Sequence, residues 1–101
     1  MDMLMLTLVV PCAIEESLFD ALLELTPADT GFTTFHAEGH GRSLAQASAS
    51  ERVRGRRAQS LTVLILPAAA IDTLIAALQL RFAGSGLHWW TAPADATGRL
   101  A

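Results

Sequence analysis

Three side chains able to ligate a metal ion recur at every second position of one short stretch, as His36, Glu38 and His40. Successive side chains of a strand point to opposite faces, so these three would share one face if a strand continued through Gly39. Imidazole and carboxylate groups suit zinc, copper or nickel, and a neighbouring strand or a second chain could complete the coordination. His88 is a further candidate ligand. The alternative is a solvated strand edge, since three polar residues are weak evidence for coordination.

A second group of residues has the chemistry of an anion-binding cleft between subunits. Glycines let backbone N–H groups approach phosphate oxygens closely, and arginine supplies paired donors. The group consists of Gly39, Gly41, Arg42, Gly84, Gly86 and Arg99. The same glycines would also serve as turns, so spacing alone leaves both interpretations open.

Positive charge is concentrated in one part of the chain. Four of the seven arginines are Arg52, Arg54, Arg56 and Arg57, while the net charge is −3 and lysine does not occur. A nucleic-acid-binding protein is expected to have a broad basic face, so we expect no nucleic-acid partner. The arginine cluster could instead bind an acidic partner or an anionic lipid headgroup, or remain a solvated loop.

Cys12 is the only cysteine of the chain. A disulfide framework within the chain is therefore excluded, nothing requires an oxidising compartment, and a cytoplasmic location fits best. Near the start of a helix, a cysteine is either a reactive thiol or, more often, a small buried residue.

The elements that must position these residues form two similar halves. An apolar run from Met3 to Val10, too short to span a bilayer, predicts a buried strand. Helical spacing from Ile14 to Thr26 predicts a helix, and Phe32 to Glu38 predicts a second strand. The second half repeats this order with a strand at Leu61–Leu66, a helix containing Ile71, Leu74, Ile75, Leu78 and Phe82, and a strand at Leu87–Ala92.

Two such halves predict a ferredoxin-like α+β fold of order βαββαβ. Its four-stranded antiparallel sheet has two helices on one face. Residues from about 42 to 58 fit no regular element, and we expect them to form a flexible, functional loop between strands 2 and 3. The uncovered face of the sheet would be apolar, which favours oligomerisation. Trp89 and Trp90 should point to opposite faces, with at least one packed in the core or an interface.

With these elements in order, the chain resembles the PII-like signalling superfamily over nearly its whole length. The turn Gly39-His40-Gly41-Arg42 is similar to the Gly-x-Gly-Arg turn that opens the long T-loop of that family. The run from Trp89 to Pro93, followed six positions later by Arg99, is similar to its last strand. The resemblance implies one PII-like domain over residues 1–101, a homotrimer with its sheets turned inward, and a T-loop at about 42–58.

Within the superfamily, the chain is most similar to a branch of small proteins often encoded beside bacterial heavy-metal efflux systems. The shared features are a short strand-Pro-helix start, a Gly-His-Gly turn and a final strand with tryptophan. The resemblance implies a regulatory protein that binds a small effector or a metal and acts on a partner, for which a membrane transporter is the candidate. The alternative function is a divalent-metal-binding trimer of the cation-tolerance type, without nucleotide sensing.

Two departures from the family pattern restrict what the resemblance implies. The turn Gly84-Ser85-Gly86-Leu87-His88 lacks the aspartate and lysine of the family's nucleotide-binding turn, which argues against classical ATP sensing. The chain has no tyrosine, so uridylylation of the loop is not expected. The cofactor stays open between a divalent transition metal and a nucleotide. We expect no enzyme, because acylphosphatases of this fold use an arginine in the first strand-helix turn and Pro11-Cys12-Ala13-Ile14 has none.

Overall fold

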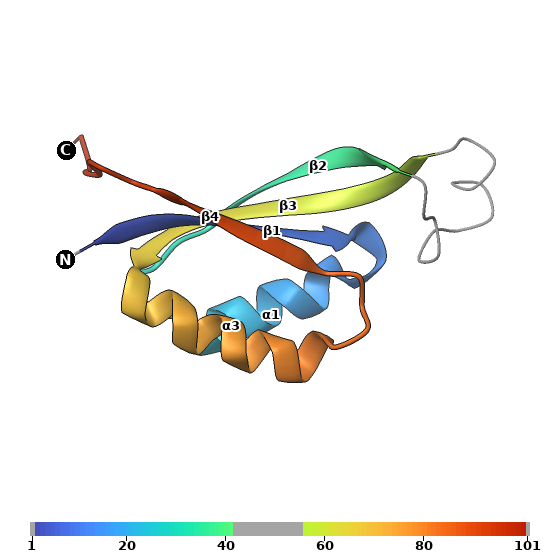
Figure 1. Ribbon diagram of the computed structural model, residues 1–101, viewed down its shortest axis with the longest axis horizontal. Helices are drawn as coiled ribbons and strands as arrows, with labels where there is room; N and C mark the ends of the chain where they lie inside the picture. The colour runs from blue at the N-terminus through green and yellow to red at the C-terminus, as the bar shows by residue number, and fades with distance from the viewer. Residues whose placement is uncertain (1, 42–55, 101) are drawn as a thin grey trace.

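The computed structural model describes residues 2–41 and 56–100. Their strands form one sheet of order β2-β3-β1-β4 with every neighbouring pair antiparallel, and both helices cover one face of it (Figure 1). The predicted ferredoxin-like fold is therefore confirmed. The elements are β1 Met3–Pro11, the 3-10 turn η1 Cys12–Ile14, α1 Glu15–Leu25, β2 Thr33–His40, β3 Arg56–Pro67, α3 Ala68–Phe82 and β4 His88–Pro93.

Two prolines mark the points where the central strands end and the helical segments begin. Pro11 ends β1 with a φ of −56°, and Pro67 ends β3 with a φ of −58°. The proline ring holds φ in this range and offers no N–H, which suits a residue just before the first helical turn. β1 and β3 pair from Met3 opposite Pro67 to Pro11 opposite Gln59. The equivalent strands of the two halves thus lie together at the centre of the sheet.

The core lies between the helices and the inward face of the central strands. Leu6, Leu8 and Val10 of β1 have no exposed surface. Burying an aliphatic side chain of this size stabilises the fold by about 1.5–3 kcal/mol relative to leaving it in water. The predicted apolar stripes of both helices face these residues, and the cluster is completed by Leu18, Ala21, Leu22, Leu64, Leu66, Ile71, Leu74, Ile75 and Leu78.

The face of the sheet away from the helices is apolar and partly exposed. Phe35, Ile65 and Trp90 are 50%, 39% and 47% exposed, and each alternates along its strand with residues that face the helices. Trp89 lies on the helix side, where it lines a pocket with Leu78 of α3. The two tryptophans therefore point to opposite faces, as predicted.

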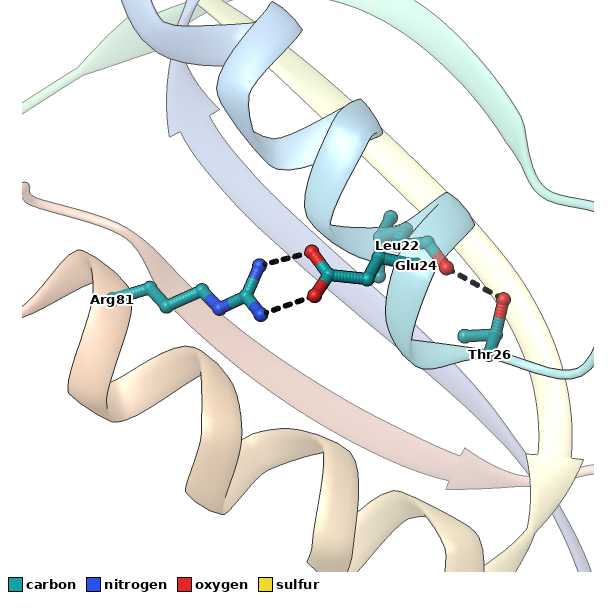
Figure 2. Close-up of polar contacts among 4 residues, drawn as sticks. All are labelled: Leu22, Glu24, Thr26 and Arg81. Atoms are coloured by element: carbon teal, nitrogen blue, oxygen red, sulfur yellow. Dashed lines mark hydrogen bonds and ion pairs between the residues drawn. The ribbon is translucent and has the colours of Figure 1, made fainter.

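An ion pair joins the two helices at their outer surface (Figure 2). Arg81 donates to the two carboxylate oxygens of Glu24 at 2.8 and 3.0 Å. Near the end of α1, the carbonyl of Leu22 accepts from both the Thr26 hydroxyl at 2.7 Å and the Thr26 backbone N–H at 3.0 Å. Among the described residues, no helix has the length and apolarity needed to cross a membrane.

Strands β2 and β3 extend further than the hydrophobic pattern predicted. β2 ends at His40, and β3 begins at Arg56 instead of Leu61. Backbone pairing continues from Glu38 opposite Ala58 to His40 opposite Arg56. These hydrogen bonds join backbone groups and do not need apolar side chains. The charged residues at this end of β3 lack the hydrophobic pattern by which a strand is predicted. The last three residues of the predicted loop at about 42–58 belong to β3, and residues 42–55 lie outside the described part.

Candidate functional site

The end of the sheet beside the β2–β3 connection is a two-stranded arm. β1 pairs with β3 only as far as Gln59, so within the described residues Glu38–His40 of β2 and Arg56–Ala58 of β3 form a strand pair to which no third strand is added. The arm projects beyond β1 (Figure 1). Glu38 Oε2 and Arg56 Nη1 lie 3.3 Å apart, with both side chains about half exposed. Since exposed ion pairs are weak, backbone pairing is the main stabilising interaction of the arm.

The two glycines at the arm have different surroundings. Gly39 lies inside β2, where an added Cβ would come within 3.0 Å of three outer atoms of Gln59, a residue only 8% exposed. Gly41 has open space where its Cβ would be. An alanine at position 39 would therefore require the Gln59 side chain to shift, which gives Gly39 a structural role that needs no ligand.

The alternation predicted for His36, Glu38 and His40 continues through Gly39, but the three side chains do not form one ligand group. Glu38 pairs with Arg56, while His36 Nε2 lies 2.9 Å from Glu15 Oε2. Within residues 2–41 and 56–100, one group of three or more His, Cys, Asp and Glu side chains has its ligating atoms within mutual reach. That group is Cys12, Glu15 and His36.

His88 is remote from the other histidines within one chain. It begins β4, at the edge of the sheet opposite β2, with β1 and β3 between them. Its ring centroid lies 6.1 Å from that of Trp90. A metal site that combined His88 with the β2 ligands would need a second chain.

Within one chain, the residues of the predicted anion-binding cleft between subunits are likewise far apart. Gly84 and Gly86 form the turn before β4 and have φ values of 78° and 83°, a region that favours glycine. Both line an apolar pocket of about 350 Å³ beside α3. Arg99 lies at the other end of the sheet, where it lines an opening with Phe32 and Ile65. Three predicted arginines, Arg42, Arg52 and Arg54, lie outside the described residues.

A family match covers the whole chain. The sequence model of the DUF3240 family, described as a protein of unknown function, matches residues 1–101. The chain belongs to the DUF3240 family. A DUF3240 family protein from Shewanella baltica has a similar solved structure, with a TM-score of 0.77, 23% identity, and coverage of 98% of this chain and 97% of that one. Among curated protein sequences, none matches.

Solved PII-like proteins have the same fold as this DUF3240 chain. CPII from Thiomonas intermedia, a nitrogen regulatory PII-like protein bound to ADP, AMP and bicarbonate, is 15% identical, with a TM-score of 0.72 and coverage of 99% and 98%. A PII-like signalling protein from Thermus thermophilus is 14% identical, with a TM-score of 0.66 and coverage of 92% and 87%. The PII-like resemblance is thus confirmed for the fold.

Sequence reasoning identified His36 in this DUF3240 protein but missed the residues that meet it. Cys12 and Glu15 are three positions apart, a spacing that places two side chains on one side of a helical turn. That spacing was available in the sequence. Glu15 and His36 are 21 residues apart, and their contact depends on where β2 lies relative to the first turn of α1. A pattern of neighbouring residues does not predict such a contact.

Proposed function

We propose that this DUF3240 protein is a homotrimeric regulatory protein that binds a small effector and acts on a partner protein. The observation that best supports this function is the two-stranded arm, Glu38–His40 with Arg56–Ala58, in a PII-like fold. The arm holds the ends of the segment joining β2 and β3 beyond the rest of the sheet. A segment that begins and ends beyond the rest of the sheet can contact a partner protein. An effector bound at the base of the segment can change its conformation and so its contact with the partner.

The trimer would form through the face of the sheet opposite the helices. Phe35, Ile65 and Trp90 lie on this face and are between 39% and 50% exposed. Apolar side chains gathered on one face are typical of a protein–protein contact. The inward-turned sheets that the PII-like resemblance implies would cover them.

The effector site would lie between two chains. Gly39 and Gly41 are at the β2 edge of the sheet, whereas Gly84 and Gly86 precede β4 at the opposite edge. The end of β2 and the turn before β4 are at the same end of the sheet, so contact between adjacent chains would bring them together. Backbone N–H groups and Arg57 on the arm favour an anion, and CPII, with ADP, AMP and bicarbonate, gives the ligand classes to try first.

The partner we propose is a membrane transporter for heavy-metal efflux. It follows from the branch of the superfamily that the sequence resembles, and a pull-down with such a transporter from the same genome would test it. Because the segment joining β2 and β3 would make the contact, a variant lacking residues 43–55 should fail to bind the transporter while keeping its effector affinity.

Titration calorimetry of the full chain with AMP, ADP, ATP and bicarbonate tests the effector. We expect at least one of them to bind, with ATP the weakest nucleotide. Arg57→Gln on the arm should then weaken binding. Arg99→Gln should weaken it only if a neighbouring chain supplies Arg99, since Arg99 lies at the far end of its own sheet. Absence of binding to all four ligands would contradict the anion site.

A divalent-metal-binding trimer of the cation-tolerance type is the second candidate. The proximity of Cys12, Glu15 and His36 favours it. In this case zinc, copper or nickel would bind with no nucleotide binding, and removal of residues 43–55 would leave metal affinity unchanged. The same calorimetric series, run with metals, separates the two functions.

A further inference from the structure

We propose that Cys12, Glu15 and His36 form a binding site for a divalent transition metal, with zinc as the best-matched ion. The sulfur, oxygen and nitrogen atoms that would bind the ion all lie within 4.8 Å of one another. The site shares only His36 with the alternating set on β2. It specifies the site for the metal-binding candidate function and is independent of the regulatory function, because it needs neither a second chain nor the segment joining β2 and β3.

Three elements of the fold converge on this site. Cys12 is the first residue of the 3-10 turn η1, and Glu15 is the first residue of α1. A 3-10 turn has about three residues, so side chains three positions apart lie one above the other. His36 comes from β2, where it is opposite Ser60, a fully buried residue of β3. The three side chains thus come from a 3-10 turn, the first residue of a helix and a strand paired within the sheet.

The distances fit a metal after small side-chain movements. His36 Nε2 lies 2.9 Å from Glu15 Oε2 and 3.3 Å from Oε1. Ligand atoms around a tetrahedral zinc ion, with bonds of about 2.0–2.3 Å, are about 3.2–3.8 Å apart. The hydrogen bond between His36 and Glu15 would be replaced by two bonds to the metal. Because no separation in the group exceeds 4.8 Å, none would need to shorten by more than about 1.0–1.6 Å, which rotation of a side chain supplies.

The donor set selects a class of ion. A thiolate together with an imidazole and a carboxylate disfavours magnesium and calcium, which prefer oxygen ligands, and suits zinc or cobalt. Three protein ligands leave one tetrahedral position for water or another ligand. The Glu15 side chain is 18% exposed and the His36 side chain 70% exposed. An ion could therefore enter from the His36 side while Glu15 holds it from within.

The simpler explanation of the cluster is a hydrogen-bonded His36–Glu15 pair beside a cysteine that does not participate. The two explanations differ in what Cys12 does. A metal site requires the sulfur as a ligand, so replacing it must change the spectrum and the affinity of the bound ion. If His36 and Glu15 form only a hydrogen-bonded pair, replacing Cys12 should change neither the spectrum nor the affinity of any metal ion that binds.

Cobalt titration of the full chain, prepared metal-free under reducing conditions, tests the site. Tetrahedral cobalt bound to a thiolate gives a near-ultraviolet charge-transfer band and intense visible bands, and added zinc should displace it. We expect one ion per chain. Cys12→Ser should abolish the charge-transfer band, and Glu15→Gln and His36→Gln should each weaken zinc binding at least about tenfold, or ~1.4 kcal/mol.

Matched controls come from the same region and from the other histidines. Glu16→Gln, His40→Gln and His88→Gln should leave cobalt spectra and zinc affinity unchanged. Circular dichroism of each metal-free variant checks folding, and Cys12→Ala is a second test of the sulfur. Wild-type spectra without the charge-transfer band would overturn the proposal, as would unchanged zinc affinity in Cys12→Ser and His36→Gln. Neither outcome depends on nucleotide binding, which tests the regulatory function separately.

Discussion

Arg81 of α3 and Glu24 of α1 form a paired-hydrogen-bond contact across 57 positions of the sequence (Figure 2). The guanidinium group donates to both carboxylate oxygens, a geometry that matches the planar forks of the two groups. The hydrogen bond, followed by charge attraction, lowers the pKa of Glu24 and raises the pKa of Arg81. Because the side chains are 63% and 41% exposed, water and salt screen the pair, and its effect on stability should be small.

We predict that Glu24→Gln lowers the melting temperature slightly near neutral pH and that this difference disappears in acid. A carboxyl group whose pKa is lowered by folding stabilises the protein above its unfolded pKa, and this contribution is lost as the pH falls through the folded pKa. Thermal unfolding from about pH 7 to about pH 3, at low and high salt, measures the effect. Asp95→Asn, beyond β4, is the control. A difference that stayed constant across this pH range would contradict the assigned pKa shift.

We predict that Gly39 and Gln59 are energetically coupled. An alanine at position 39 would place its Cβ against the outer atoms of Gln59. Gly39→Ala should therefore lower the free energy of unfolding more in the wild-type protein than in the Gln59→Ala variant. The difference should be about 1 kcal/mol, measured as a double-mutant cycle by chemical denaturation at fixed protein concentration. The double-mutant cycle is needed because replacing glycine by alanine also lowers the conformational entropy of the unfolded chain. This effect is the same in both backgrounds and cancels in the cycle. Additive effects would mean that Gln59 moves aside without cost.

We predict that Thr62→Val stabilises the protein. The hydroxyl groups of Thr62 and Ser60 are buried and have no hydrogen-bond partner among the described residues. Removing an unsatisfied hydroxyl while keeping the side-chain shape should raise the free energy of unfolding by about 1 kcal/mol. Thr73→Val, at an exposed position of α3, should change it little. Destabilisation by Thr62→Val would indicate that the hydroxyl has a partner in solution.

We predict that Ile65→Glu or Phe35→Glu converts the proposed trimer into monomers. Each substitution places a charge on the apolar face of the sheet that the proposed contact would bury. Light scattering after size-exclusion chromatography gives the mass. Leu80→Glu is the matched control, because Leu80 is 87% exposed on α3 and faces away from the sheet. If Leu80→Glu separated the chains and Ile65→Glu did not, the contact would lie on the helix side.

The sequence by itself determined the order of the elements, the core and the fold. Apolar side chains at strand and helix periods must be buried, and the two similar halves, each with a strand ended by proline, allow few arrangements in one domain. Leu6, Leu8 and Leu64 are buried as their pattern predicts. The apolar pattern of the strands also predicted that the face of the sheet away from the helices would be apolar, and Phe35 and Trp90 lie partly exposed on that face.

Only the tertiary structure decided which polar side chains meet. The sequence grouped His36 with Glu38 and His40 because they share a face, but side chains on one strand compete with partners from other elements. Glu38 pairs with Arg56, and His36 with Glu15. Polar contacts depend on atomic distances between segments that are remote in the chain. Hydrophobic periodicity specifies which side of an element is buried, and it does not specify those distances.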